Sequence, residues 1–262
     1  MQSDKAIFNR VSLLVGHEAM ERIRGARVIV FGVGGVGSWC VESLVRSGIM
    51  HVTIVDGDLV SATNVNRQIM ATTMTVGEPK VEALRRRLLE INPSCEVIAM
   101  QRRFNEETAD TFSLSSYDYI IDAIDALKDK ALLIMRACDT GAVFFSSMGA
   151  ALKIDPTRVR TAEFWKVRGC TLGAALRKKM KRAGMKPARK FTCVYSEEML
   201  DNRGMSDEDP GEKAVVNGTL AHITGIFGLT IAGLVMQDIC ARGCPDGTQE
   251  PHDDAGEPHG RA

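Results

Sequence analysis

The sequence has no excess of charge of either sign. Its 262 residues include 33 Lys and Arg and 33 Asp and Glu, so the formal net charge is zero. A protein that attracts nucleic acid through its overall charge is strongly basic, and this balance excludes that class of explanation. Any contact with a polyanion must therefore come from a local cluster of cations.

The first ten residues lack the apolar core that a secretory signal needs. Cysteines are few, and the seven present are scattered and odd in number, which is typical of reduced thiols rather than of a disulfide framework. We therefore expect a cytoplasmic protein. Cys193 lies in an apolar stretch with no His or Lys beside it, so we expect a buried, unreactive thiol.

Long apolar runs are also scarce. The stretch from Gly218 to Ile239 is long enough to cross a bilayer, but His222, three threonines and four glycines interrupt it. We expect a helix in the core or at a subunit interface, and no membrane association. Residues 243–262 are rich in Pro, Gly and acidic residues and have little to bury, so we expect a disordered tail.

A glycine-rich turn is the strongest local signal. Val28 to Phe31 reads as a strand buried on both faces, and residues 38–47 read as a helix. The glycines between them fit G-x-G-x-x-G with one more glycine: Gly32, Gly34, Gly35 and Gly37. Such a turn brings backbone amides and the positive end of the helix dipole to an anion, typically a nucleotide phosphate. A tight turn without a ligand fits the same pattern.

Polar residues after this turn narrow the choice of nucleotide. Asp56 ends the next strand, residues 51–55, where a carboxylate reaches a ribose hydroxyl. A second carboxylate, amides and two cations follow: Asp58, Asn64, Arg67, Gln68 and Lys80. A dinucleotide oxidoreductase needs neither the second carboxylate nor the basic pair. A triphosphate site needs cations on the phosphates and carboxylates for magnesium, so we predict ATP and Mg²⁺ as cofactors.

Strand and helix signals alternate through the remaining chain. We expect strands at residues 95–100, 117–123 and 143–146, and helices at 81–91, 106–112 and 127–140. This order predicts an α/β fold, a Rossmann-like doubly wound and mainly parallel sheet with flanking helices and a C-terminal extension. Asp122 and Asp125 end the fourth strand, at the edge of the sheet where ligands bind. They indicate a magnesium site, or Asp122 caps the following helix.

Four ordered segments carry a family resemblance: GVGGVGSW, VDGDLVSATNVNRQI, GEPKVEA and IDAIDALKDK. Together they resemble the adenylating domain of the ubiquitin-activating enzyme superfamily, the ThiF, MoeB and HesA group. Within it, they are most similar to the tRNA threonylcarbamoyladenosine dehydratases, from about Phe8 to about Ile239. The resemblance implies one adenylating domain over residues 1–242, which activates a carboxylate on a modified tRNA adenosine with ATP and closes it into a ring.

The resemblance also implies roles for single residues. Arg67 and Lys80 hold phosphates, and Asp125 is linked to the metal with Asp122 in support; Ala126 replaces the usual asparagine. Arg10 reaches the phosphate site of the neighbouring subunit of a homodimer, although composition alone fits a solvated arginine equally well.

The alternative within the superfamily is an adenylyltransferase for a ubiquitin-like sulfur-carrier protein, with that carrier as a partner. Such enzymes commonly bear two C-x-x-C pairs for zinc, and this sequence has none. That absence favours the dehydratase. Outside the superfamily, an NAD-linked oxidoreductase and a non-catalytic RNA-binding module remain alternatives.

A basic insertion covers about residues 164–190. Between Lys166 and Lys190 there are ten Lys and Arg and no Asp or Glu. A local bias of this size in a neutral chain favours contact with a polyanion, and we expect tRNA there. Phe164 and Trp165 at its edge are candidates to stack on an exposed base. The other interpretation is a solvated helix with acidic neighbours.

Overall fold

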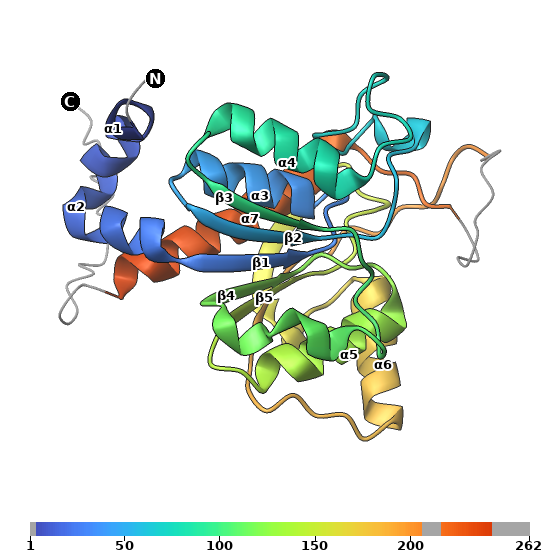
Figure 1. Cartoon of the computed structure of the whole chain (residues 1–262). Coiled ribbons are helices and arrows are strands. Elements are labelled where there is room, and N and C mark those ends of the chain that lie inside the picture. Colours follow the sequence, from blue (N-terminus) through green and yellow to red (C-terminus); the bar gives the residue numbers. More distant parts are fainter. Residues whose placement is uncertain (1–3, 206–215, 243–262) are drawn as a thin grey trace, which may run out of the picture.

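The computed structural model describes residues 4–205 and 216–242, and Figure 1 shows their arrangement. The strands form one seven-stranded sheet in the order β3-β2-β1-β4-β5-β7-β6. All neighbouring pairs are parallel except β6 with β7. The strands are β1 (Arg27–Phe31), β2 (His51–Val55), β3 (Glu96–Met100), β4 (Tyr119–Asp122), β5 (Val143–Ser147), β6 (Val159–Glu163) and β7 (Thr192–Ser196).

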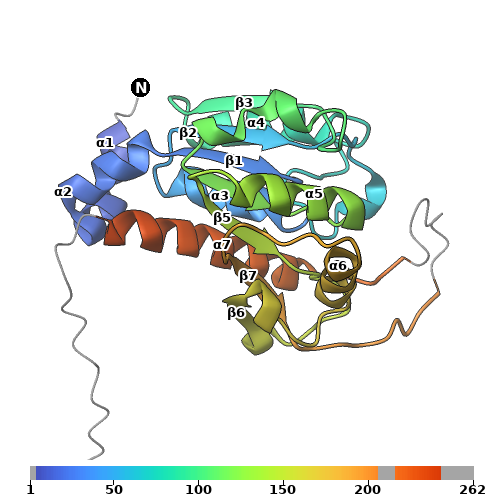
Figure 2. The same ribbon diagram turned by 90° about the horizontal axis from the view of Figure 1, so that it is seen from below.

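Both faces of the sheet are covered, because its strands are apolar on both sides. Alternate residues of β1 enter two separate cores: Val28 and Val30 the first, Ile29 and Phe31 the second. The first core includes α2 (Asn9–Gly25), α3 (Gly37–Arg46), α4 (Lys80–Ile91) and α7 (Ala221–Ala241), and the second includes α5 (Leu127–Cys138) and α6 (Thr171–Arg182). Figure 2 shows α5 on the face turned toward the viewer. A short helix, α1 (Asp4–Ile7), precedes α2.

The order of the strands fixes where a ligand binds. The chain moves outward from β1 through β2 to β3, and then returns to place β4 on the other side of β1. The connections after β1 and β4 therefore leave in opposite directions, and sheets with this strand order have a ligand crevice between those connections, at the carboxyl ends of the strands. The glycine turn follows β1 and Asp125 follows β4, so topology brings these two predicted features together.

The predicted α/β architecture is confirmed, but its details differ at two places. Residues 106–112 do not form the predicted α-helix; they form turns and a short 3-10 helix at Ala109–Phe112. Thr108 explains part of this difference, because its backbone and side chain bond to Asn105 and Arg103 and hold a turn. The antiparallel edge made by β6 and β7 was not predicted. The predicted disordered tail, residues 243–262, lies outside the described residues.

The apolar stretch near the C-terminus forms α7, a core helix. Among the described helices it alone is long and apolar enough to cross a membrane, and half of its most apolar window is buried. Gly228 brings it against α3 so closely that a β-carbon there would lie 2.4 Å from the carbonyl oxygen of Val36. Ile231, Val235 and Ile239 are almost completely buried in the first core. The expectation of a core position is thus confirmed.

Candidate active site

The glycine turn is closed against the loop that follows β4. Gly32 has φ of +83°, and a β-carbon on it would lie 2.7 Å from the carbonyl oxygen of Ala123. A β-carbon on Gly37 would lie 1.9 Å from the carbonyl oxygen of Gly32. Both positions require glycine for steric reasons. The turn thus places the first amides of α3 in the crevice, directly beside residues 123–126.

Asp56 holds the glycine turn from the end of β2. Its two carboxylate oxygens accept hydrogen bonds from the backbone N–H groups of Val33 and Asp58, each at 2.9 Å. Burial raises the pKa of Asp56, an effect that Lys80 and the two amides partly offset. The side chain is partly exposed, and each oxygen keeps lone pairs for a ribose hydroxyl. Its position is that of the predicted ribose ligand.

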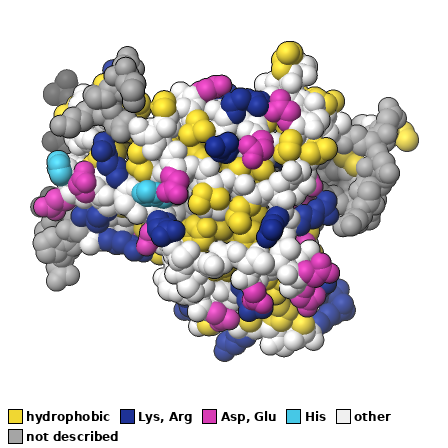
Figure 3. Space-filling model, viewed as in Figure 1, with side chains coloured by type: hydrophobic (Ala, Val, Ile, Leu, Met, Phe, Trp, Pro, Cys, Tyr) yellow, Lys and Arg dark blue, Asp and Glu magenta, His cyan; other side chains and the backbone are white. Residues whose placement is uncertain are grey.

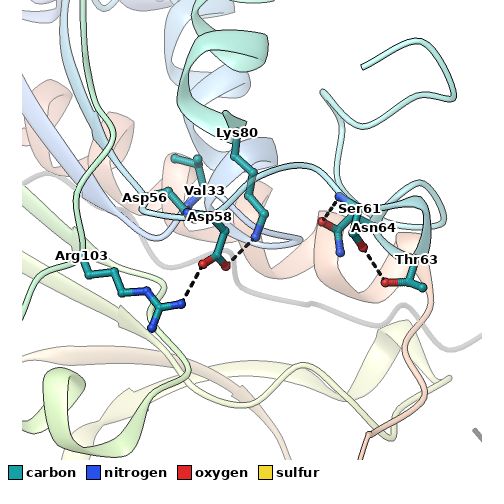
Figure 4. A network of polar contacts seen from close by, with 8 residues as sticks. All are labelled: Val33, Asp56, Asp58, Ser61, Thr63, Asn64, Lys80 and Arg103. Carbon is teal, nitrogen blue, oxygen red and sulfur yellow. Dashed lines mark hydrogen bonds and ion pairs between the residues drawn. The ribbon is translucent and has the colours of Figure 1, made fainter. Parts of the chain in front are cut away.

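Asp58 lies between two cations, as Figure 4 shows. Lys80 Nζ lies 2.9 Å from one of its oxygens, and Arg103 lies 3.2 Å from the other. Burial alone would raise the pKa of Asp58, but Lys80 and Arg103 together lower it below its usual value. The ion pair fixes Lys80, which is only 7% exposed, at the first turn of α4. Asp58 therefore acts as an orienting partner for cations.

Arg103 was missed as a candidate residue. It follows β3, and the carboxyl ends of β1, β2, β3 and β4 meet at one edge of the sheet. The sequence held that signal, because Arg102 and Arg103 come two and three residues after a predicted strand, 95–100.

Arg67 packs against the glycine turn. Its guanidinium donates to the backbone carbonyl of Thr63 at 2.9 Å and to Asn66 Oδ1 at 2.8 Å. A β-carbon on Gly35 would lie 3.4 Å from Arg67 Cγ, and the Trp39 indole donates to the Arg67 carbonyl at 3.0 Å. These contacts hold the arginine over the first turn of α3.

Asn64 and Gln68 have different roles in the same segment. Asn64 Oδ1 accepts the Ser61 N–H at 3.1 Å and closes the short 3-10 helix Ala62–Asn64, also drawn in Figure 4. Gln68 is 5% exposed, and its Nε2 would lie 3.7 Å from a β-carbon on Gly34. Its Oε1 is buried and has no hydrogen-bond partner among the described residues. A buried amide oxygen of this kind favours a ligand that brings a donor to the turn.

Asp122 is fully buried in an ion pair with Lys130, at 2.7 Å. It also accepts hydrogen bonds from Ser146 Oγ at 2.7 Å and from the Ile124 N–H at 3.1 Å. Lys130 in turn donates to the carbonyl of Ile124 at 3.0 Å. Through these bonds to Ile124, the pair fixes the first part of the loop at residues 123–126. Lys130 was not among the predicted residues, because the sequence alone does not distinguish it from a lysine on the exposed side of the predicted helix 127–140.

Asp125 lies in the loop between β4 and α5 and is exposed at the crevice. The described residues contain no group of three or more His, Cys, Asp or Glu that would hold a metal by itself. Mg²⁺ does not need one, because it usually binds one or two carboxylates together with substrate phosphates and water. The exposed carboxylate of Asp125 lies at the same edge of the sheet as the glycine turn, a position that suits a metal bound together with a nucleotide.

Two other predicted features, Arg10 and Cys193, lie outside the group of side chains described above. Arg10 is exposed in the first turn of α2, and α2 lies at the end of the sheet where β1 begins, opposite to the end that carries the glycine turn (Figure 1). Cys193 is completely buried on β7, and this burial raises the pKa of its thiol well above the usual value. The prediction of a buried thiol is confirmed, and the raised pKa agrees with an unreactive one.

The comparison with known families decides between an adenylating enzyme and an NAD-linked oxidoreductase. The ThiF family model matches residues 8–253. The chain belongs to the ThiF family. Its glycine turn, its ordered polar residues and its strand order are therefore those of a ThiF-type adenylating fold, and the NAD-linked oxidoreductase is not supported.

Relatives within the ThiF family differ in how much of the chain they match. The tRNA threonylcarbamoyladenosine dehydratase of Bacillus subtilis is 35% identical over 88% of this chain and 94% of its own length. The Escherichia coli enzyme TcdA in complex with ATP is 31% identical, with a TM-score of 0.80, over 93% of this chain and 100% of that chain. A sulfur carrier protein adenylyltransferase of Thermus thermophilus is 36% identical over only 50% of each. Similarity over the whole fold thus favours the dehydratases.

Proposed function

We propose that this protein is an ATP-dependent adenylating enzyme that dehydrates N-threonylcarbamoyladenosine in tRNA to its cyclic form. The observation that carries the proposal is the full-length similarity to TcdA, which was solved with ATP. The geometry agrees with it, since the glycine turn, Arg67, Lys80 and Asp125 come from separate elements and border one crevice.

The chemistry has two steps. A carboxylate oxygen of the modified nucleoside attacks the α-phosphorus of ATP, and the bond to pyrophosphate breaks. A nitrogen or hydroxyl of the same nucleoside then attacks the activated carbonyl carbon, and the bond to the AMP oxygen breaks. One carboxylate oxygen leaves within AMP, so the nucleoside loses one water in total. Cys193 is buried and protonated, and no protein nucleophile is needed for this sequence.

The side chains of the crevice bind and orient. The amides of the glycine turn and the start of α3 receive the phosphates, and Asp56 receives the ribose. Arg67, held by Thr63 and Asn66, and Lys80, held by Asp58, neutralise the charge that grows on the phosphates. Asp125 would hold magnesium, which supplies further neutralisation of phosphate charge when it is bound. Asp122 and Lys130 position the Asp125 loop.

The assembly we propose is a cytoplasmic homodimer without membrane association. Helix α2 lies at the end of the sheet opposite to the glycine turn (Figure 1), which supports a role for Arg10 in the crevice of a second copy. Leu13 and Leu14 beside it are 78% and 86% exposed, and such an apolar helix face suits a subunit contact. A sulfur carrier or sulfur-transfer protein remains the partner in the alternative function.

The test is incubation of the protein with ATP, magnesium and tRNA that carries threonylcarbamoyladenosine. We expect the modified nucleoside to lose the mass of one water, with one AMP and one pyrophosphate formed for each nucleoside converted. Mass spectrometry of the digested tRNA and a pyrophosphate assay measure these quantities. Unchanged nucleoside mass would refute the dehydratase. Pyrophosphate exchange that requires a small carrier protein ending in Gly-Gly would support the alternative instead.

A further inference from the structure

The basic segment is a folded unit with an unpaired cationic surface. Leu176 and Met180 of α6 are buried in the second core, and the opposite side of the helix carries exposed Lys178, Lys181 and Arg182. None of these three forms an ion pair with an acid of the described residues. The space-filling view in Figure 3 shows Lys and Arg side chains at the lower right, where α6 lies, with Asp and Glu side chains beside them. Ion pairs with acids of the described residues therefore do not neutralise Lys178, Lys181 and Arg182.

The two aromatic residues at the start of this segment have different surroundings. Phe164 is completely buried and stacks on Phe191, with ring centroids 5.0 Å apart and planes 20° apart. The expectation that Phe164 stacks on a base is therefore wrong, because its faces are used in the core. Trp165 is 40% exposed, and Phe164 meets it edge-on at 5.0 Å. Phe164 thus supports Trp165 and leaves it at the surface.

A groove lies beside the exposed indole. It is lined by Trp165, Lys181, Gly184, Met185 and Lys186. Lys181 Nζ lies 5.8 Å from the centre of the indole ring, and Lys186 lies on the loop after α6. Gly184, with φ of +66°, allows this loop to turn, and nothing lies within 4 Å of the space a β-carbon would fill. The groove therefore combines an aromatic surface, open space and two cations.

We propose that this groove binds an unpaired nucleotide of an RNA, with the base stacked on Trp165 and its phosphates on Lys181 and Lys186. An exposed indole set among cations, in a segment without acids, is the arrangement that binds single-stranded nucleic acid. An acidic peptide would use the cations but would leave the indole without a role. The proposal rests on the proposed function, because it identifies where the tRNA substrate contacts the protein outside the crevice.

The groove lies at the C-terminal end of α6, and the N-terminal end of this helix packs beside the carboxyl end of β5. There, a β-carbon on Gly173 would lie 3.3 Å from Met148 Sδ, just after β5 ends. The 12 residues of α6 span roughly 18 Å. That length corresponds to about five stacked nucleotides at roughly 3.4 Å each. An RNA loop of that length would therefore reach from the groove to the edge of the sheet at which β5 ends.

Binding of an unmodified tRNA transcript to the full chain, without ATP, tests the groove separately from catalysis. We expect Trp165→Ala to weaken binding by about 10-fold or more, and Trp165→Phe to restore most of it, because phenylalanine keeps a stacking face. The double change Lys181→Gln and Lys186→Gln is expected to weaken binding and to reduce the slope of log K against log salt by about 0.7 for each lost phosphate contact. Lys178→Gln removes one charge from the same helix outside the groove and serves as the matched control.

Indole fluorescence gives a second measurement. The sequence has two tryptophans, Trp39 and Trp165, so the transcript is expected to quench the wild-type protein much more than Trp165→Phe. Trp165→Ala binding within twofold of wild type, or a Lys178→Gln effect equal to that of Lys181→Gln, would overturn the proposal. Poly-glutamate that competes as well as RNA, in both wild type and Trp165→Ala, would identify an acidic peptide site instead. If RNA binds as expected but the nucleoside never loses water, only the proposed function fails.

Discussion

Replacing Arg67 with alanine is expected to lower the turnover of modified tRNA at least ~100-fold. The guanidinium is held by Thr63 and Asn66, and the side-chain stem of Arg67 lies beside Gly35 of the glycine turn, so in this account the cation is positioned near the phosphates before ATP binds. Removing a fixed charge contact of this kind has an effect of that size, and we expect the same of Asp125→Ala. Steady-state formation of AMP on modified tRNA measures both variants.

Arg85→Ala is the matched control for Arg67→Ala. Arg85 is about half exposed on α4 and pairs only weakly with Glu82, at 3.6 Å, so turnover is expected to stay within about twofold of wild type. Near-normal turnover of Arg67→Ala would mean that the phosphates lie elsewhere.

Mixing variants extends the same experiment to Arg10. If Arg10 acts in the neighbouring subunit, subunits with Arg10→Ala and subunits with Arg67→Ala, each inactive alone, form mixed dimers with one intact site. Activity should then return on mixing. Its absence, with mixed dimers demonstrated, would contradict the role in trans.

Replacing Lys130 with methionine is expected to destabilise the protein by about 3–5 kcal/mol, because it leaves the Asp122 carboxylate buried without its counter-charge. Both side chains are completely inaccessible to solvent and lie 2.7 Å apart. Urea unfolding followed by circular dichroism measures the loss in the free energy of unfolding.

Two further variants test whether the buried charge of Asp122 causes the loss of stability. Lys128→Met, on the same helix, removes an exposed charge that pairs with Glu106, and little change is expected. Adding Asp122→Asn to Lys130→Met removes the stranded charge, and the amide can accept from the Ile124 N–H and donate to Ser146 Oγ, so most of the lost stability should return. A Lys130→Met protein within about 1 kcal/mol of wild type would show that this pair is not dry in solution.

Sequence patterns predicted those elements of the fold that depend on residues close together in the chain. The strand at Val28 to Phe31, the glycine turn and Asp56 each depend on a short run of residues, and the parallel order follows from their alternation with helices. The antiparallel β6 was missed because its largely exposed residues, Val159 to Glu163, become a strand only through pairing with β7, whose residues lie 29 to 37 positions further along the chain.

In the candidate site, too, residue types were predicted from the sequence, whereas their contacts were not. Asp58 and Lys80 were predicted by residue type, but their 2.9 Å ion pair depends on where α4 begins after a long loop. Phe164 was placed on the surface because it neighbours Trp165, yet it faces the second core. Charge and aromatic content locate a surface segment; only packing decides which of two adjacent rings reaches solvent.

The central claim is that the turn at Gly32 to Gly37 holds ATP, with Arg67 and Lys80 on its phosphates. A crystal structure of the protein with ATP tests this most directly. We predict the triphosphate against the first amides of α3, the ribose on Asp56, and both cations within hydrogen-bonding distance of phosphate oxygens. An empty crevice at saturating ATP, or a nucleotide bound with Arg67 and Lys80 far from its phosphates, would contradict the account.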